Sequence, residues 1–510
     1  MPLMPISRPN LTTAQPGAPL SHSATRMMHA VGLHDEGRYV ESLALFEQLL
    51  REEPNRYDLL TWVAILRAQL GAFSEALLLL EASLRMAPDQ SNAHNARAIC
   101  LYKLSRFEEA IAAFERAAEL GLNAANRNKS TVLTTLGRFE EANAYCDLAL
   151  QDDPNDATVY HDKAMPLFAM RRFDEVLAAL DKSLELKPGY AEAYFNKALL
   201  LLAMGDFTNG WDLFEWRWRM EEARAAVVQT RQRVGRKPLW LGDRIIEGKT
   251  ILLHAEQGFG DTFQFLRFVP YVTALGAKVI LQVPVSMKRL AASLDCDCTI
   301  LTPADELPPI DMHCPLMSLA KALNLQPGRI PAPRAYLRAD PALLSAWSER
   351  LGPWRRPRIG LVWFGSMLGG LPNLKSMAFE DITSLTNCDA DFFALQKSPR
   401  PEDLVFQRNE QVWDLGEELG DFADTAAAMT LMDLIISVDT GPAHLAGALG
   451  RPLWIMLPSH PEWRWPDGET TPWYPSARQF WQPAPSDWAT PLAEVRAALR
   501  TWIPTIRGPE

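Results

Sequence analysis

The sequence has little cysteine, an excess of acidic over basic residues and no long apolar run. Six cysteines in 510 residues are too few for a disulfide framework. With 62 acidic against 51 basic residues the net charge is −11, which disfavours nucleic acid or an anionic membrane surface as a partner. No apolar run reaches the ~18–20 residues that a membrane span requires.

The first residues also lack a targeting signal. Residues 1–24 are rich in Pro, Ser and Thr and contain no apolar segment of the kind a secretion signal needs. We therefore expect a disordered leader on a cytoplasmic protein. Hydrophobic residues make up 48% of the chain, which is enough to build several buried cores, and a prior of ~150 residues per domain predicts about three domains.

An aromatic residue recurs at a nearly constant spacing over the first 220 residues. The steps are 34, 34, 32, 34 and 34, between Tyr39, Phe73, Phe107, Phe139, Phe173 and Phe207. A small residue recurs with the same steps at Ala30, Ala64, Ala98, Ser130, Ala164 and Ala198. This is the tetratricopeptide (TPR) pattern of two helices per 34 residues. Six repeats in register predict an all-α superhelix, with a shorter turn at the step of 32, and its concave face suits peptides or protein segments.

The sixth repeat does not end in a polar cap. It runs into Trp211–Trp218, where tryptophans and phenylalanine alternate with charged residues. An uncapped terminal repeat must dock on something, so we predict a buried aromatic seam with the following domain.

Two α/β halves follow. Apolar strands are predicted at 250–255 and 278–283, separated by a glycine loop and a helix over 263–275, and the pattern restarts after Pro357. This order implies right-handed crossovers and parallel sheets. The predicted strands of the second half are 359–363, 392–396, 434–438 and 453–457, and a helix is expected over 492–503. Two such Rossmann-like units place a ligand cleft at the carboxyl ends of their strands.

The sharpest local motif lies between the strand at 434–438 and a helix. Thr440 can cap the helix, Gly441 permits close backbone approach and Pro442 suits the first turn. Free N–H groups at such a helix start make an anion site. There His444 could donate to a phosphate oxygen and Asp439 could accept from a sugar hydroxyl. The alternative is an ordinary capped turn with a solvated histidine.

Other candidates come from loops that follow predicted strands. Gly258, Gly260 and Asp261 place a carboxylate in the cleft, where it could take a proton from an attacking hydroxyl. Lys375 and Lys397 follow strands of the second half and could neutralise phosphate charge, or be ordinary surface lysines.

Ordered motifs from residue 25 to 482 resemble those of a known family. They are Gly205–Phe207 with Trp211–Trp218, His254–Thr262, Asp311–Leu316, Leu395–Lys397, Asp421–Ala427, Asp439–Ala448, Trp463–Trp465 and Trp473–Pro475. They resemble bacterial TPR-fused GT-B glycosyltransferases of the heptosyltransferase type (glycosyltransferase family 9). The architecture is also similar to that of O-GlcNAc transferases and of TPR-containing flagellin glycosyltransferases.

The resemblance implies an inverting, metal-independent transfer from a nucleotide sugar, with no cofactor. Asp261 matches the proposed general base, in the acceptor-side loop with Gln257, Gly258 and Gly260. The donor-binding positions are Lys375, Ser376, Lys397, Asp439, Thr440, Gly441 and Pro442, with His444 as the second catalytic residue. The implied boundaries are a leader at 1–24, TPR array at 25–220, linker at 221–248, acceptor half at 249–356, donor half at 357–482 and C-terminal helix at 483–510.

Three functions stay open at this point. The first is a cytoplasmic protein O-glycosyltransferase whose TPR array holds an acceptor protein, with flagellin and a CMP-nonulosonic acid as first guesses. The second is transfer to a lipid or polysaccharide. The third is a TPR scaffold with a degenerate transferase half, suggested by the departure of residues 363–372 from the family pattern.

Overall fold

The computed structural model describes residues 22–326, 328, 330–353, 355–365, 375–397, 412–459 and 462–506. It comprises two compact units, one formed by the described residues up to Pro188 and the other by those from Gly189 onward. Most of the predicted leader lies outside the described residues, and the first helix begins at His22. No helix among the described residues is long and apolar enough to cross a membrane.

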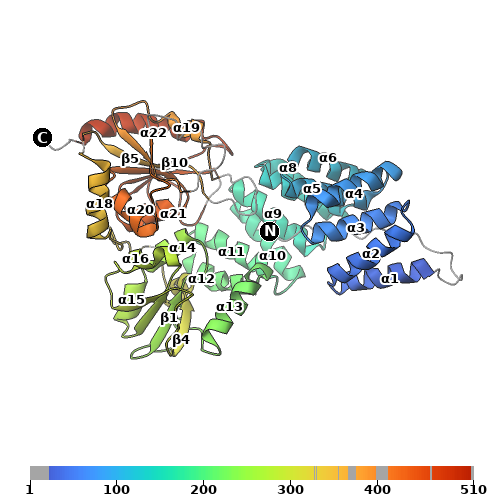
Figure 1. The fold of residues 1–510 in the computed structure, drawn as a ribbon, viewed down its shortest axis with the longest axis horizontal. Coiled ribbons are helices and arrows are strands. Elements are labelled where there is room, and N and C mark those ends of the chain that lie inside the picture. The colour runs from blue at the N-terminus through green and yellow to red at the C-terminus, as the bar shows by residue number, and fades with distance from the viewer. Residues whose placement is uncertain are drawn as a thin grey trace. The chain divides into compact units, whose positions relative to one another are not determined.

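Six helical pairs form the first part of the chain, as the repeat pattern predicts (Figure 1). Five pairs belong to the first unit and the sixth to the second. The pairs are α1 (His22–Asp35) with α2 (Tyr39–Glu52), α3 (Tyr57–Gln69) with α4 (Phe73–Met86), α5 (Ser91–Lys103) with α6 (Phe107–Glu119), α7 (Ala124–Thr135) with α8 (Phe139–Asp152), α9 (Ala157–Ala169) with α10 (Phe173–Leu186), and α11 (Ala191–Ala203) with α12 (Phe207–Phe214).

Every repeat marker has a defined place in these pairs. Each of the six aromatic residues is the first residue of the second helix of its pair, and each of the six small residues is buried in the first helix. The predicted shorter turn is wrong. The connection between α6 and α7 keeps four residues, as its equivalents do, and the two missing residues come from the helices, since α6 has 13 residues and α7 has 12 where α4 has 14 and α5 has 13.

The sixth pair packs on the α/β region through aromatic side chains. Trp211 is 3% exposed, and its ring centroid lies 6.3 Å from that of Phe265 and 5.3 Å from that of Trp463. Phe207 contacts Trp473 at 6.2 Å. These rings share one apolar core with both sheets, so the predicted aromatic seam is confirmed.

The first α/β half contains a four-stranded parallel sheet of order β3-β2-β1-β4. Its strands are β1 (Thr250–His254), β2 (Lys278–Gln282), β3 (Cys298–Leu301) and β4 (Met312–Pro315). Its α-helices are α13 (Arg224–Val234), α14 (Phe259–Leu266), α15 (Val269–Ala274), α16 (Lys288–Ala291), α17 (Leu319–Ala322) and α18 (Pro341–Leu351). The stretch predicted as a linker, 221–248, thus includes α13.

The helix predicted over 263–275 is two helices in the structure. Arg267 lies between them and is almost fully buried. Its guanidinium is satisfied there because it donates to the carbonyls of Gln264 and Trp473. Pro270 is the second residue of α15, where a residue without an N–H costs no helical hydrogen bond. The break between the helices thus places Arg267 where it binds the segment at Trp473.

The second half contains a six-stranded parallel sheet of order β10-β9-β8-β5-β6-β7. Its elements are β5 (Arg358–Val362), α19 (Phe379–Thr383), β6 (Asp391–Ala394), β7 (Val412–Asp414), α20 (Phe422–Thr430), β8 (Leu434–Val438), α21 (Gly441–Ala448), β9 (Leu453–Leu457), β10 (Ala477–Trp481) and α22 (Ala489–Trp502). Side chains of α19 and α22 cover one face of the sheet, and those of α20 and α21 cover the other.

Gly447 sets how closely α21 packs beneath the segment that follows β9. A Cβ at this position would lie 2.2 Å from Cδ1 of Tyr474, so Gly447→Ala must push a buried ring aside. We expect a net loss of about 1–2 kcal/mol in unfolding free energy, because overpacking outweighs the better helix propensity of alanine. Chemical denaturation followed by tryptophan fluorescence measures it.

Gly32→Ala is the control. It also replaces a helical glycine, but a Cβ there has no neighbour within 4 Å, so it should leave stability unchanged or raise it. Equal stability for Gly447→Ala and the wild type would contradict the packing argument.

Candidate active site at the meeting of two helix N-termini

The amino ends of α14 and α21 lie against each other, one from each α/β half (Figure 1). Glycines permit the approach: a Cβ on Gly260 would lie 2.7 Å from Cδ2 of His444, and one on Gly441 would lie 3.6 Å from Cβ of Phe259. Neither N-cap residue caps its helix through a side chain. Helix starts with free N–H groups and positive dipole ends favour anions, so this contact is a candidate anion site.

Thr440 occupies the N-cap of α21, but its hydroxyl does not cap the helix. The hydroxyl donates to the carbonyl of Val438 at 3.3 Å instead. The expectation that this side chain caps the helix is therefore wrong. Pro442 lies in the first turn as predicted.

Asp439 is the buried centre of the donor half of the site. Its side chain is 7% exposed, and its Oδ2 accepts from the Lys375 ammonium at 2.5 Å and its Oδ1 from the Trp465 indole at 2.8 Å. Burial alone would raise the pKa of Asp439, but Lys375 and then His444 hold that pKa well below its usual range. The carboxylate is thus ionised and positions Lys375. Burial alone would lower the pKa of Lys375, but the charges of Asp439 and Glu462 together raise it.

His444 lies in the first turn of α21 and is 5% exposed. Its Nδ1 pairs with the Tyr474 hydroxyl at 2.8 Å, and its Nε2 lies 3.8 Å from Oδ1 of Asp439. Burial lowers the pKa of His444 to about 4, although Asp439 opposes the shift. The imidazole is therefore neutral at pH 7, and it is buried rather than solvated.

Asp261 lies in the first turn of α14 and forms an ion pair with Arg464 through its Oδ1. Its Oδ2 is directed toward Gly258, where an added Cβ would lie 3.5 Å away. One carboxylate oxygen is thus held, while the other accepts no hydrogen bond from any residue that the structure describes.

Arg464 is the residue that sequence reasoning missed. Besides Asp261 it binds Glu462 and donates to Oε1 of Gln264 at 2.7 Å, and its guanidinium stacks 4.0 Å from the Trp463 ring centroid. Burial raises the pKa of Glu462, against the opposing charge of Arg464. An arginine between two tryptophans was the available signal, but only the fold brings it beside Asp261.

The remaining candidates have structural partners. The Ser376 hydroxyl accepts from the Gly365 amide at 3.1 Å. The Lys397 ammonium donates to the carbonyls of Leu419 and Gly420 at 2.7 and 2.6 Å. Gln257 and Gly258 are exposed at the start of α14. The divergent loop noted above lies outside the described residues from 366 to 372. No group of three or more His, Cys, Asp or Glu among the described residues could hold a metal.

The structure thus consists of a TPR array followed by two parallel-sheet α/β halves, with a candidate anion site where the halves meet. Family comparison agrees: the glycosyltransferase family 9 (heptosyltransferase) model matches residues 420–490, and two tetratricopeptide repeat models match 33–100 and 95–157. The chain therefore combines TPR repeats with a glycosyltransferase-type region, consistent with a TPR-fused heptosyltransferase-type enzyme.

Protein FlbA of Caulobacter vibrioides is 27% identical over 289 residues. The match covers 51% of this chain and 48% of the relative, so the chain spans about half the length of the curated relative it matches. Among solved structures, a thermophilic TPR protein of Thermus thermophilus, TTC0263, is 24% identical over 35% of this chain and 99% of its own, with a TM-score of 0.32. YrrB, a TPR protein with an unusual peptide-binding site, is 18% identical over 37% and 97%, with a TM-score of 0.29.

Lowering the pH should lower the free energy of unfolding, because His444 is buried in its neutral form. Its pKa is about 4 in the folded protein and ~6.5 when unfolded. Between these values the unfolded chain binds more protons, so stability is full above pH ~6.5 and falls as the pH drops toward 4, by about 3 kcal/mol at most. His444→Gln should make this decline shallower in urea unfolding followed by tryptophan fluorescence from pH 8 to 4.

His29→Gln removes an exposed imidazole and is the matched control, expected to keep the wild-type decline. Burial also lowers the pKa of His254, to about 3, so part of the decline should remain in His444→Gln. An identical decline in the wild type and His444→Gln would show that His444 does not carry this linkage.

Proposed function

We propose that this protein is an inverting, metal-independent glycosyltransferase that moves a sugar from a nucleotide-activated donor to a serine or threonine hydroxyl of an acceptor protein. The observation that carries the proposal is the convergence of the α14 and α21 N-termini around Asp261 and His444. A carboxylate with one free oxygen faces a site built for an anionic leaving group. The family 9 match across Asp439, His444 and Arg464 supports it.

In the proposed reaction Asp261 takes the proton of the acceptor hydroxyl through Oδ2. The oxygen attacks the anomeric carbon of the donor, and the bond to the nucleotide phosphate breaks on the opposite face. Arg464 holds Asp261 by its other oxygen, so the base enters the reaction in a set orientation.

The leaving phosphate gains negative charge as its bond to the sugar breaks. The first-turn N–H groups of α21 and the Lys375 ammonium would stabilise that charge, and preorganised donors act most strongly in such a site. Because His444 is neutral, its Nε2 can donate one hydrogen bond without adding a charge beside Lys375. No metal is needed in this scheme, since helix dipoles and Lys375 supply the positive potential.

The acceptor part of the proposal rests on the TPR array. Stacked repeats present an extended surface suited to protein segments, and six repeats exceed what a small acceptor requires. Flagellin is the first acceptor to test, and a CMP-nonulosonic acid the first donor.

Asp261→Asn should lower kcat by about 10²–10⁴-fold while leaving donor affinity within a few-fold, because it removes the base and keeps the shape. The measurement is nucleotide release from a panel of sugar nucleotides, together with the intact mass of the acceptor protein. Asp295→Asn, which changes an exposed aspartate of the same half, is the control. Unchanged turnover in Asp261→Asn would exclude it as the base, and an altered envelope glycan with unmodified protein would exclude a protein acceptor.

The donor class can be found by thermal stability against UDP, GDP, ADP and CMP. A nucleotide at 100 times its Kd stabilises the unit it binds by about 2.7 kcal/mol, and Lys375→Met should lose most of that shift, because the cleft loses its ammonium. A shift with CMP alone would favour the nonulosonic acid donor. No shift with any nucleotide or nucleotide sugar would favour the scaffold alternative.

A further inference from the structure

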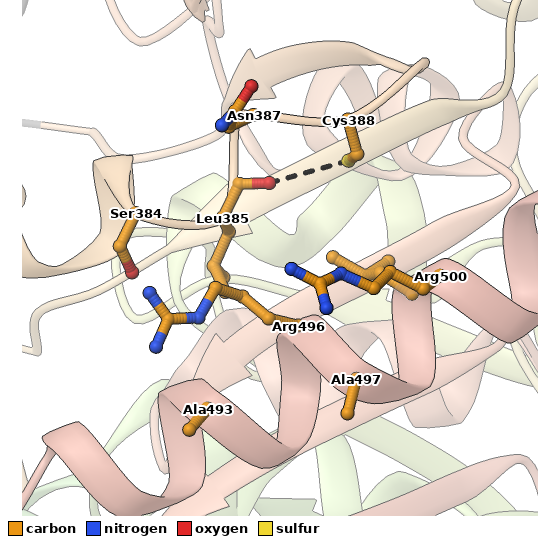
Figure 2. Close-up of a pocket in the computed structure, with 9 residues that line it drawn as sticks. Ser384, Leu385, Asn387, Cys388, Ala493, Arg496, Ala497 and Arg500 are labelled. Carbon is orange, nitrogen blue, oxygen red and sulfur yellow. Dashed lines mark hydrogen bonds between the residues drawn. The ribbon is translucent and has the colours of Figure 1, made fainter.

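A polar cavity lies in the second α/β half, and neither Asp261 nor His444 lines it. It has a volume of about 360 Å³ and lies between α22 and the segment 384–388 that follows α19 (Figure 2). Arg496 and Arg500, one helical turn apart on α22, both reach toward that segment (Figure 2).

The two guanidinium groups have no counter-charge in the described part of the chain. No described carboxylate lies within 4 Å of either one. The acidic residues that follow segment 384–388, Asp389 and Asp391, are both paired with Arg356, and Asp381, which precedes it, accepts from the Ala378 amide at the start of α19. Both arginines are exposed to solvent as well as lining the cavity, so two hydrated cations border it with no described carboxylate beside them.

A hydroxyl in the cavity wall also lacks a partner. Oγ of Ser384 is buried and makes no hydrogen bond to any described residue, although buried polar atoms are normally satisfied. The cavity thus combines an unsatisfied hydroxyl with two unpaired cations, which is the donor set that a phosphate group would satisfy.

The cavity and the site at Asp439 lie at opposite ends of the parallel strands of one sheet. Segment 384–388 precedes β6, whereas Asp439 follows β8, and these strands are parallel. A nucleotide sugar bound at the N-terminus of α21 therefore does not place its phosphates here. The site needs its own ligand.

We propose that this cavity binds the phosphate group of a small phosphate monoester. Arginine pairs with phosphate through parallel charge-assisted hydrogen bonds. Arg496 and Arg500 donate to the phosphate oxygens, and the Ser384 hydroxyl becomes a third donor when its side chain turns from the wall into the cavity. The volume exceeds that of a bare phosphate and falls within the ~300–1,000 Å³ of small-molecule sites, so the organic part lies in the cavity too. The inference is independent of the transfer reaction.

The test is isothermal titration calorimetry of the full chain with inorganic phosphate and with glucose 6-phosphate, in KCl of matched ionic strength. The variant Arg496→Gln/Arg500→Gln should bind the ester at least about 10-fold more weakly than the wild type, because two charge-assisted contacts are lost. Ser384→Ala should weaken binding less.

Arg51→Gln/Arg85→Gln is the matched control. It removes the same charge from two exposed arginines in the last turns of α2 and α4, and Arg500 lies in the last turn of α22, so the control reproduces the helix-dipole effect without the cavity. It should retain wild-type affinity, which also separates this site from phosphate bound in the cleft.

Three results would overturn the proposal. One is equal affinity in the two double variants, and another is no binding of either probe by the wild type at ~10 mM, a concentration at which even millimolar sites fill. Equal affinity for inorganic phosphate and the ester would overturn the inference that the organic part occupies the cavity.

Discussion

The close contact between the N-termini of α14 and α21 is the constraint on which the rest of the site depends. It requires a residue without a side chain at position 260, because a Cβ there would enter the ring of His444. With the helices this close, Asp261 from one half and His444 from the other share one site. The aromatic seam from α12 lies behind the same contact, since Trp211 packs on both Phe265 and Trp463.

The two aspartates of the site, Asp439 and Asp261, are paired in different ways. Asp439 accepts one hydrogen bond on each oxygen, from Lys375 and from Trp465, so it holds these two side chains in place on the α21 side of the site. Arg464 restrains Asp261 but leaves its Oδ2 open. Such buried ion pairs contribute little net stability, but removing one partner leaves an uncompensated charge and is costly. These ion pairs therefore fix the positions of the side chains more than they raise the free energy of unfolding.

The polar cavity beside α22 differs from this site in how its charges are paired. In the cleft nearly every charge has a partner of opposite sign, whereas Arg496 and Arg500 have none among the described residues. The two proposed anion sites lie at opposite ends of the parallel strands of one sheet, so the sheet separates them and each would take its own ligand.

Much of this architecture could be predicted from the sequence. The repeat markers predicted the six helical pairs, because an aromatic and a small residue at fixed spacing are local requirements of helix packing, and the structure shows that each aromatic marker begins the second helix of its pair. The strands at 250, 278, 359, 434 and 453 were equally clear, since strands buried on both faces are continuous apolar runs. The short edge strands β3, β4, β7 and β10 were missed because they carry no such run.

The sequence by itself determined the repeat array, the two parallel sheets and the helix start at Gly441, because these depend on local periodicity and turn chemistry. Only the tertiary structure decided that Asp439 pairs with Lys375, that Thr440 does not cap its helix, and that Arg464 forms an ion pair with Asp261, 203 positions away in the sequence. Contacts between segments so far apart are set by how the sheets and helices pack, and no local pattern encodes them.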